Sequence, residues 1–394
     1  MFFSSLRTTA FRNLADTEIF TGAKDVFLIG ENGQGKTNFL EALYFCAYGS
    51  SFRTIKDSEL ARNSLSETEQ VINGGKTFSA EVKLAQSVND ELLVKFEKNK
   101  KSVFINKKRA EDRKELLSIA PTIVFCHEDM DFVTGSPERR RWFFDQTLSL
   151  YDPVYLDDLR RYRRILKSRN TLLRDHAQKK CVDDPELILD ALDPQLAAYG
   201  QNLMEKRRIA AQEFSDVFCA LYGEVSGISG INVQYIQSWK STNEDDILIH
   251  LKHRRAADMA AGLSLTGPHR DRYLFAHNKS VSYLSQDNIL QNNASNNNMT
   301  DFTITASTGQ KRLLALLLRA AQARRFSAVT GQNPILLLDD VLLEMDGEKR
   351  RRFISVLPAY DQAFYTFLPD EPYQRYQKED TLVYWVKDGK VEKE

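Results

Sequence analysis

The pattern of apolar and polar residues predicts strand-helix units at both ends of the chain. Val26 to Ile29 is an uninterrupted apolar run, and Asn38 to Tyr48 repeats apolar residues at helical spacing. Near the other end, Ile335 to Leu338 forms a second apolar run. Short apolar runs bounded by turn residues are typical of strands buried on both faces. Strands that alternate with helices favour an α/β fold with a parallel sheet.

The middle of the chain has a helical pattern instead. One run extends from Pro153 to Lys180 and another from residue 193 to residue 222, each with apolar residues three and four positions apart. A helix of about 25 residues is nearly 40 Å long. We therefore expect two long antiparallel helices that form an arm between the two α/β segments.

Composition limits the classes of protein that fit this pattern. The chain has 394 residues, with 54 basic and 54 acidic side chains and no net charge, so any surface that binds nucleic acid must be local. The length favours more than one domain. The four cysteines form no CxxC pair, which indicates a reducing compartment and no zinc site.

No segment of the sequence is predicted to enter a membrane. The first residues lack an apolar core of signal-peptide length. No uninterrupted apolar run reaches the roughly 18 residues that a spanning helix needs. We expect a cytoplasmic protein without a membrane partner.

The turn between the first strand and the first helix matches the pattern G-x-x-x-x-G-K-[ST] through Gly30, Gly35, Lys36 and Thr37. In this pattern backbone N–H groups surround phosphates, the lysine reaches the β- and γ-phosphates, and the hydroxyl binds Mg²⁺. The alternative is a glycine-rich turn that binds nothing. The residues expected to bind ATP are Gly30, Glu31, Asn32, Gly33, Gln34, Gly35, Lys36, Thr37 and Asn38.

Two adjacent aspartates follow the second apolar strand. A P-loop needs an acidic residue at the end of a neighbouring strand to hold Mg²⁺. Asp339 is the candidate metal ligand together with Thr37, and Asp340 is the candidate for polarising the attacking water. With Lys36 these aspartates make up the expected catalytic set. A strand cap at a turn is the alternative reading of the pair.

The two halves of this candidate site lie about 300 residues apart. A single mononucleotide-binding unit does not need so much intervening chain. We therefore expect a split ATPase domain, with its halves at residues 1–125 and 281–394 and a mainly helical insertion at residues 126–280.

Ser307, Thr308, Gly309 and Gln310 open the helical pattern that precedes the second strand. This sequence resembles the signature motif of the ATP-binding-cassette superfamily, in which the start of the helix binds the γ-phosphate held by a second subunit. The resemblance implies an ATP-dependent homodimer, with Ser307, Gly309 and Gln310 in contact with the nucleotide. The alternative is an amphipathic helix for which Ser307 is only the N-cap.

Further segments resemble the RecF family of the SMC branch, and the first of them implies a nucleotide contact for Arg12. This sequence differs from the family pattern at His127, Arg272 and Leu343. The similar segments are FRNL at 11–14, SSFRT at 50–54, FCHEDMDFVTGSPERRRWFFD at 125–145, YRRILKSRNTLL at 162–173, LTGPHRDR at 265–272 and DDVLLEMD at 339–346.

The resemblance implies an ABC-type P-loop ATPase head split by an inserted helical arm. It also implies an ATP-dependent DNA-binding protein of recombinational repair and replication restart, with weak DNA-dependent ATPase activity. Duplex, single-stranded and gapped DNA, RecR, RecO and RecA loading are the partners and outcome that it implies. An SMC-type structural ATPase and an ABC-family ATPase subunit of another complex remain the alternatives.

Two basic runs are candidates for contact with DNA phosphates. Residues 95–114 hold nine basic and three acidic side chains, and residues 159–180 hold nine basic and one acidic. Arg160, Arg163, Arg164 and Lys167 occupy nearby positions on one predicted helix. A solvated helix face is the alternative.

Two further segments carry expectations of their own. The asparagine-rich segment at residues 285–301 has no apolar periodicity and is expected to be a disordered loop. In the segment GSPERRRWFFD, Arg139 or Arg140 is expected to pair with Asp145 or to cap the helix.

Overall fold

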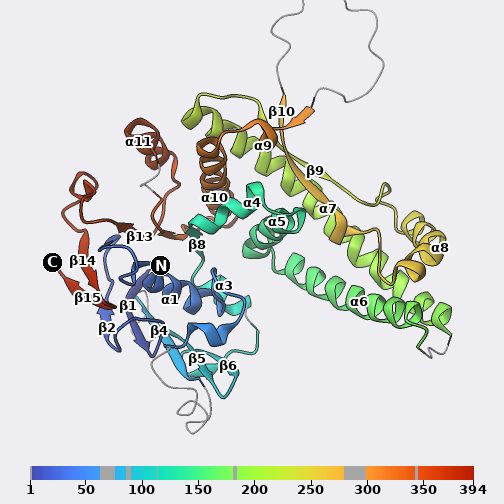
Figure 1. Cartoon of the computed structure of the whole chain (residues 1–394), viewed down its shortest axis with the longest axis horizontal. Helices are drawn as coiled ribbons and strands as arrows, with labels where there is room; N and C mark the ends of the chain where they lie inside the picture. Colours follow the sequence, from blue (N-terminus) through green and yellow to red (C-terminus); the bar gives the residue numbers. More distant parts are fainter. Residues whose placement is uncertain are drawn as a thin grey trace, which may run out of the picture. The chain divides into compact units, whose positions relative to one another are not determined.

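The protein is described by a computed structural model that covers residues 2–62, 76–85, 90–112, 114–180, 184–278, 299–341 and 345–394. The chain divides into two compact units, each traced in Figure 1. The first unit comprises residues 1–129 and 323–394, and the second comprises residues 130–322.

The first unit contains a six-stranded sheet in the order β15-β14-β3-β13-β12-β8. The five strands from β14 to β8 are parallel, and only β15 is antiparallel to its neighbour. β3 and β12 are buried at every position, as expected for parallel strands covered on both faces. The strands are β3 (Asp25–Ile29), β8 (Thr122–Phe125), β12 (Ile335–Leu338), β13 (Gln362–Phe367), β14 (Leu382–Lys387) and β15 (Lys390–Lys393).

A second six-stranded sheet in the same unit is entirely antiparallel, in the order β2-β1-β4-β5-β6-β7. Its inner strands alternate buried and more exposed residues, so one face packs on the core. The strands are β1 (Phe3–Thr9), β2 (Glu18–Phe20), β4 (Phe78–Leu84), β5 (Glu91–Glu97), β6 (Lys100–Ile105) and β7 (Lys108–Arg109).

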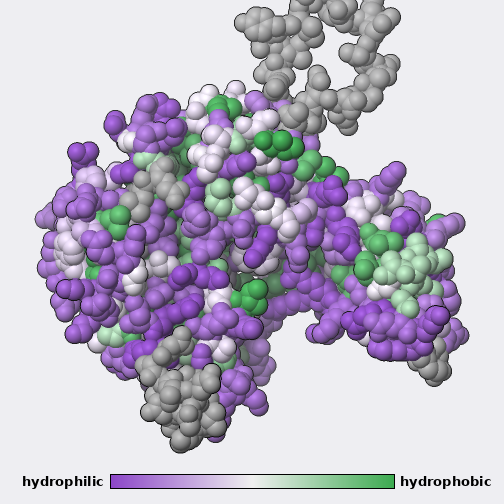
Figure 2. Space-filling model, viewed as in Figure 1, coloured by the Kyte–Doolittle hydropathy of each residue, from purple (hydrophilic) through white to green (hydrophobic). Residues whose placement is uncertain are grey.

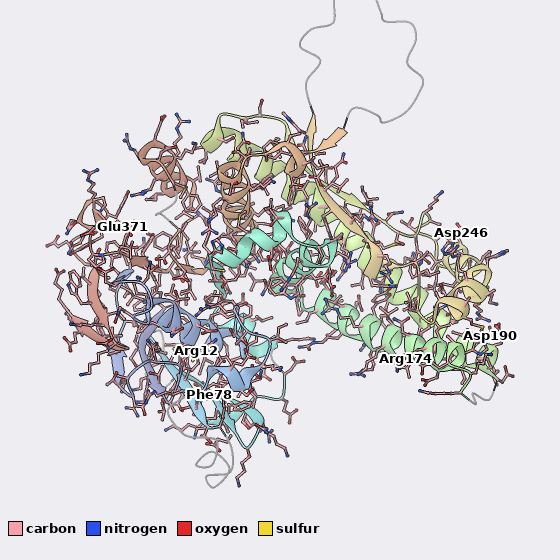
Figure 3. The ribbon with its side chains drawn as sticks, in the orientation of Figure 1. Arg12, Phe78, Arg174, Asp190, Asp246 and Glu371 are labelled. Carbon is pink, nitrogen blue, oxygen red and sulfur yellow. The ribbon has the colours of Figure 1, made fainter. Side chains whose placement is uncertain are left out.

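Helix α1 (Lys36–Tyr48) packs between the two sheets. It contacts β4 and β5 of the antiparallel sheet and β8 and β13 of the parallel sheet, and eleven of its residues are buried. A helix that is apolar all round is a buried helix. Phe78, labelled in Figure 3, joins α1 to the antiparallel sheet, because its ring centroid lies 5.6 Å from that of Phe45 and 5.2 Å from that of Phe96.

Short helices complete the first unit. They connect the sheets or follow strands of the parallel sheet. These are the α-helices α3 (Lys114–Ile119) and α11 (Gly347–Val356) and the 3₁₀ turns η1 (Asp57–Leu60), η2 (His127–Met130) and η4 (Tyr373–Arg375).

The second unit is built on two long helices. α6 (Pro153–Ala177) and α7 (Pro185–Ser226) pack against each other along the arm in Figure 1. Both begin after an aspartate N-cap with proline at the first position, and α7 ends at Gly227 in the left-handed conformation. The expected pair of long helices is confirmed, and α7 starts eight residues before the expected boundary at residue 193.

The second unit also contains a three-stranded antiparallel sheet, in the order β11-β10-β9. β11 contradicts part of the loop expected at residues 285–301, since residues 299–301 pair with β10. The rest of that loop lies outside the described residues. The elements are α4 (Asp131–Thr134), α5 (Pro137–Tyr151), β9 (Ile231–Ile236), α8 (Glu244–Ala261), η3 (Pro268–Arg270), β10 (Arg272–Asn278), β11 (Met299–Asp301), α9 (Phe302–Thr305) and α10 (Thr308–Thr330).

The second unit extends to residue 322 rather than to the expected boundary at residue 280. Arg140 of α5 donates to the Asp301 carboxylate at 3.3 Å. The Arg319 guanidinium of α10 lies 4.7 Å from the centroid of the Phe132 ring. These contacts hold β11 and the first part of α10 on the helices of the second unit.

No helix within the described ranges combines the length and the apolar character that a membrane crossing requires. The face drawn in Figure 2 is mostly hydrophilic, with an apolar patch over α8 at the end of the arm. Ile249 of α8 is 56 % exposed.

Candidate nucleotide-binding site

The phosphate-binding loop leaves β3 at Gly30 and enters α1 at Lys36. Gly30 lies so close to β14 that an added Cβ would be 2.3 Å from the Val386 carbonyl oxygen. Gly33 and Gly35 have φ values of 80° and 120°, which residues with a side chain rarely adopt. The glycines of the motif therefore meet real steric requirements of the loop.

Lys36 lies inside the loop. Its Nζ atom donates to the carbonyl oxygens of Gly30 at 2.6 Å and Glu31 at 3.1 Å. The side chain is buried, and its ammonium group lies beside the start of α1, whose free N–H groups favour an anion. A cation and a helix N-terminus are thus placed together for a phosphate.

The two halves of the predicted site meet directly. The Thr37 hydroxyl donates to the Asp339 carboxylate at 2.9 Å, across 302 positions of sequence. Asp339 follows β12 and Thr37 follows β3, and β13 lies between these strands in the parallel sheet. The carboxyl ends of parallel strands share one edge, and this edge holds both residues.

Thr366 of β13 completes this cluster, and the sequence did not indicate it. Its hydroxyl accepts from the Asp340 backbone N–H at 2.7 Å and lies 2.9 Å from Asp340 Oδ1 and 3.3 Å from Asp339 Oδ1. Asp340 has a φ of 51°, in the left-handed region. The Thr366 hydroxyl is therefore shared by the two aspartates and fixes the backbone between them.

Burial in an apolar sheet, and after it the charge of the adjacent Asp340, raise the pKa of Asp339 to about 7. Hydrogen bonds from Thr37 and Thr366 act in the opposite direction. In the described part of the chain neither aspartate forms an ion pair with a lysine or arginine. The site thus holds excess negative charge that a cation would compensate.

Arg12 lies in the first unit, where Figure 3 labels it. Its guanidinium makes two hydrogen bonds to the buried Glu41 of α1, at 2.9 and 3.1 Å, and a third to the Glu59 carbonyl oxygen. A bidentate pair of this kind is strong and directional. Arg12 therefore anchors α1 in this structure, and its expected contact with the nucleotide stays a prediction.

The remaining loop residues differ in exposure. Glu31, Asn32 and Gly33 are exposed. Asn38 donates from Nδ2 to the Asn13 side chain at 2.7 Å and accepts from Arg53 Nη1 at 3.0 Å. Arg53, which the sequence analysis did not assign, therefore lies at the start of α1.

The signature segment lies in the second unit, at the exposed start of α10. The Ser307 N–H donates to Gln310 Oε1 at 2.8 Å, and the Gln310 N–H donates to Ser307 Oγ at 3.3 Å. This reciprocal pair is a capping box. The N-cap reading of Ser307 is thus confirmed as local geometry. The expected contact with the nucleotide of a second subunit stays a prediction. In this structure Gln310 occupies the Ser307 N–H, which a phosphate would use.

The four predicted DNA contacts on α6 have different surroundings. Arg163 is 57 % exposed and pairs with Asp145 at 3.1 Å, and Arg160 lies 4.0 Å from Asp157. Arg164 and Lys167 are exposed and pair with no acidic side chain among the described residues. The basic run at residues 95–114 forms exposed turns and the edge of the antiparallel sheet, at Lys98, Lys100, Lys107, Lys108 and Arg109.

The sequence suggested that Arg139 or Arg140 pairs with Asp145. In the structure neither arginine does so. Arg207 of α7 is buried and donates to Asp145 at 2.7 Å and to Asp271 at 2.9 Å. Arg139 instead lies 3.5 Å from Asp131, and Arg140 donates to Asp301. The expected pairing with Asp145 is therefore wrong, because Arg207 of α7 supplies the guanidinium that binds this carboxylate.

The segments that resemble RecF in the arm are also structural. The Tyr162 hydroxyl lies 2.8 Å from His269 Nδ1, and His269 Nε2 lies 3.0 Å from the Ser264 carbonyl oxygen. Burial lowers the pKa of His269 to about 4, so the ring is neutral and donates from Nε2. Arg169 donates to Asp193 and Asp258, both at 2.8 Å. These buried groups join α6, α7 and α8.

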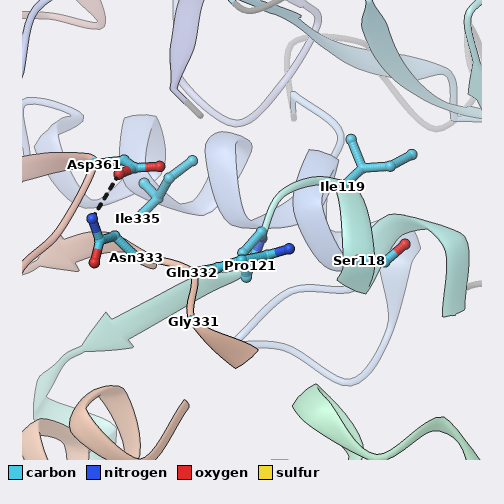
Figure 4. Close-up of a pocket in the computed structure, with 8 residues that line it drawn as sticks. All are labelled: Ser118, Ile119, Pro121, Gly331, Gln332, Asn333, Ile335 and Asp361. Carbon is cyan, nitrogen blue, oxygen red and sulfur yellow. Dashed lines mark hydrogen bonds between the residues drawn. The ribbon is translucent and has the colours of Figure 1, made fainter. Parts of the chain in front are cut away.

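A cavity of about 280 Å³ in the first unit lies away from the phosphate-binding loop (Figure 4). Ile335 at the start of β12 and Pro121 before β8 line it, so it lies at the amino ends of the strands. Its charged group, Asp361, accepts from Asn333 at 3.1 Å. This cavity does not have the positive groups that a nucleotide requires.

The comparisons with known proteins agree with this geometry. The family model RecF/RecN/SMC N terminal domain matches residues 2–387. The chain is 40 % identical to the DNA replication and repair protein RecF of Treponema pallidum, over 96 % of this chain and 97 % of that protein. It is 28 % identical to the RecF protein of Clostridium botulinum strain Okra, over the full length of both.

Solved structures show the same fold. The structure of the recombination mediator protein RecF with ATP, from the RecFOR pathway, aligns with a TM-score of 0.80 at 24 % identity, over 100 % of this chain and 97 % of that chain. An Smc head bound to the C-terminal winged-helix domain of ScpA aligns with a TM-score of 0.53 at 15 % identity, over 100 % and 97 % of the two chains. The expected ABC-type α/β head with an inserted arm is confirmed.

Proposed function

The chain belongs to the RecF/RecN/SMC family, and we propose that it is an ATP-dependent DNA-binding protein of recombinational repair and replication. Relatives named DNA replication and repair protein RecF match it along nearly their whole length. We further propose that ATP drives closure of a homodimer on DNA and that slow hydrolysis reopens it.

The hydrogen bond between Thr37 and Asp339 carries this proposal. It brings a P-loop hydroxyl to a carboxylate at the end of another strand of the same sheet, which is the arrangement that a nucleoside triphosphate and its cation require. Lys36 supplies positive charge beside the same loop. A glycine-rich turn that binds no ligand would not need a carboxylate such as that of Asp339 beside its threonine.

The cluster fits Mg²⁺. Hydroxyl and carboxylate oxygens are the ligands that this ion takes in phosphate sites. Burial and the adjacent Asp340 charge disfavour the ionised form of Asp339 and raise its pKa, and a bound cation would offset both effects. Thr37 and Asp339 would hold the ion. When bound, it would neutralise charge on the β- and γ-phosphates.

Each residue of the proposed nucleotide site then has one role. Backbone N–H groups of the loop and the start of α1 bind phosphate oxygens, and Lys36 neutralises them. Asp340, held by Thr366, accepts a hydrogen bond from the attacking water and orients it. Asp339 stays ionised when the cation is present.

The dimer is proposed from the start of α10. An exposed helix N-terminus favours an anion, and Ser307 and Gly309 leave room for a phosphate of a second subunit. For binding, Gln310 has to release the Ser307 N–H and turn toward the phosphate. Closure depends on ATP because only the closed pair supplies both sets of ligands.

DNA is proposed to contact the exposed basic side chains of α6. Arg164 and Lys167 present charge without a recorded acidic partner, and Arg160 and Arg163 lie on the same stretch of helix. Such contacts read the phosphate backbone and not the base sequence. From the family resemblance we propose RecR and RecO as partners, RecA loading as the outcome, and the cytoplasm as the location.

The test is a gel shift with single-stranded, duplex and gapped DNA, each with and without ATP and Mg²⁺. We expect ATP-stimulated binding that is strongest on DNA containing a duplex segment, and Lys36→Ala should lose the stimulation. A wild-type chain that binds no ATP, or whose DNA affinity ignores ATP, contradicts the proposal.

A further inference from the structure

The hairpin formed by the last two strands reaches the phosphate-binding loop. β14 pairs in parallel with β3, with Trp385 opposite Ile29 at the point where the loop begins. The turn to β15 consists of Asp388 and Gly389, whose φ values of 49° and 76° are both left-handed. This geometry is typical of a two-residue hairpin turn with the sequence Asp-Gly.

The turn makes three hydrogen bonds with residues around the loop. The Asp388 N–H donates to Gln34 Oε1 at 2.6 Å, and the Gly389 N–H donates to the Gln34 carbonyl oxygen at 2.9 Å. The Gly389 carbonyl oxygen accepts from the Ala15 N–H at 2.8 Å. Both polar ends of Gln34 that can accept a hydrogen bond are therefore occupied by the turn.

Asn13 also contacts the loop. Its Nδ2 atom lies 3.4 Å from the Gly33 carbonyl oxygen, and its Oδ1 atom accepts from Asn38 at 2.7 Å. An added Cβ on Gly35 would lie 3.0 Å from the same Oδ1 atom. The loop thus contacts both a residue near the start of the chain and a turn near its end.

The contact with Gly389 sets the direction of one amide. A trans peptide is planar, so its C=O and N–H point in opposite directions. Because Gly389 holds the Gln34 carbonyl oxygen, the Gly35 N–H points to the opposite side of that peptide. The Gly35 N–H donates to no described group, so it is available to a ligand.

We propose that the Asp388–Gly389 turn is a positioning element of the phosphate-binding loop, which aims the Gly35 N–H at a phosphate oxygen. Gly389 is required for two reasons. Its φ is left-handed, and an added Cβ would lie 1.8 Å from the Asn13 carbonyl oxygen. A side chain at this position displaces the turn from Gln34 and frees the peptide plane.

Gly331 offers a matched control in the same unit. Its φ of 68° imposes similar backbone strain on alanine, but nothing lies within 4 Å of an added Cβ. Gly389→Ala and Gly331→Ala therefore share the conformational cost and differ in the collision. A difference in ATP affinity between them reports the position of the turn.

The inference rests on the proposed ATP binding, and the experiment separates the two. A fluorescent ATP analogue with Mg²⁺ is titrated into the full chain, and thermal unfolding is recorded for every variant. We expect about tenfold weaker binding for Gly389→Ala, the loss of one well-placed hydrogen bond, and Gly331→Ala within about twofold of wild type.

Gln34→Met provides a second, independent variant, because it removes the acceptor for Asp388 while keeping the length of the side chain. We expect the double variant Gln34→Met with Gly389→Ala to bind no more weakly than Gly389→Ala alone, since displacement of the turn already breaks the hydrogen bond that Gln34→Met removes. Additive losses in affinity overturn the inference and indicate a general loss of stability.

The remaining outcomes are also decisive. Unchanged affinity in Gly389→Ala overturns the inference and leaves the proposed function standing. If Gly389→Ala does not fold, unchanged affinity in Gln34→Met overturns it. A wild-type chain without ATP binding contradicts the proposed function itself.

Discussion

At the residue scale, the most informative group is Asp339, because its environment opposes its own charge. Burial and the neighbouring Asp340 raise the pKa of Asp339 to about 7 in the folded chain, from 3.8 ordinarily. The folded state therefore binds a proton more tightly than the unfolded state. The contribution of this carboxyl to stability falls as the pH rises from about 4 to about 7.

Asp339→Asn should consequently stabilise the chain in the absence of nucleotide and cation. At pH 8 we expect the free energy of unfolding to rise by about 1–3 kcal/mol, while at pH 4 the gain should nearly vanish. Urea unfolding at the two pH values measures this. The stabilisation of wild type by ATP and Mg²⁺ should be absent in the variant, and an equal gain at both pH values would contradict the assignment.

Asp340→Asn should act on a different step. The amide can still accept a hydrogen bond from Thr366, so ATP binding should remain within about twofold of wild type, while general-base assistance worth about 10²–10⁴-fold in hydrolysis is lost. Equilibrium ATP binding and single-turnover hydrolysis separate the two quantities. Hydrolysis at the wild-type rate would remove Asp340 from the proposed mechanism.

The sequence predicted the contact of Thr37 with Asp339 because each residue follows an apolar strand in a known spacing pattern. It did not predict Thr366. The strand QAFYTF has no local feature that marks one threonine, and only the pairing of β13 between β3 and β12 places it beside both aspartates. The resemblance of the FRNL segment suggested a nucleotide contact for Arg12, which stays a prediction, and the sequence could not reveal that Arg12 also pairs with the buried Glu41.

At the element scale, the arm depends on buried arginines. Arg207 joins α7 to Asp145 of α5 and Asp271 beside η3, and its guanidinium is almost fully buried. A second cluster joins Arg255 of α8 to Asp190 and Asp193 of α7, near the end of the arm where Figure 3 labels Asp190. Helix-to-helix contacts in the arm are therefore specified by charge as well as by apolar packing.

Arg207→Leu should destabilise the chain by about 3–5 kcal/mol, because it leaves Asp271 buried without its cation and Asp145 with only the exposed Arg163. Arg208 is the adjacent residue, is 57 % exposed and pairs with Glu205 on the same helix. Arg208→Leu should change stability by less than about 1 kcal/mol. Urea denaturation of both variants tests the comparison, and similar losses would contradict the role of the buried cluster.

The exposed charges of α6 provide the prediction for DNA. Replacing Arg164 and Lys167 with alanine should weaken binding uniformly across sequences and lower the slope of log affinity against log salt by up to about 0.9 for each lost contact. Arg163→Ala should in addition reduce stability, since Arg163 pairs with Asp145. An unchanged slope in the first variant would indicate that this face of α6 is only a solvated surface and does not contact DNA phosphates.

Long helices were predictable and the small sheet of the arm was not. α6 and α7 carry apolar positions over many turns, so their existence follows from the sequence with errors of a few residues at the ends. β9, β10 and β11 are short and come from distant segments. β11 has three residues and gains its conformation only from pairing with β10.

At the scale of the whole molecule, the residues predicted to contact nucleotide come from both units of the chain. The P-loop and Asp339 belong to the first unit, and Ser307 belongs to the second. From the sequence, Ser307 was predicted to belong to the ATPase domain, which corresponds to the first unit. The pairing of β11 and the contact of Arg319 with Phe132 could not be predicted. Both contacts join residues far apart in the chain.

Ser307→Arg tests the proposed assembly. The residue is exposed and its side chain only caps α10, so folding and one-sided ATP binding should persist. A bulky cation at the helix start should block the partner's γ-phosphate, and ATP-induced dimerisation, hydrolysis and ATP-stimulated DNA binding should decrease together. Analytical ultracentrifugation with ATP and Mg²⁺ measures the dimer, and a full dimer population would contradict the trans contact.

The strand order around β3 has a consequence for how the chain folds while it is synthesised on the ribosome. β3 is made early, yet both of its neighbours, β13 and β14, lie near the end of the chain. At bacterial synthesis rates this delay is on the order of tens of seconds. During that time a strand that is entirely buried in the folded protein has no neighbour in its sheet, while the second unit has all of its own residues available and can fold first. Nascent chains therefore need protection at β3, and nucleotide can bind only after translation is almost complete.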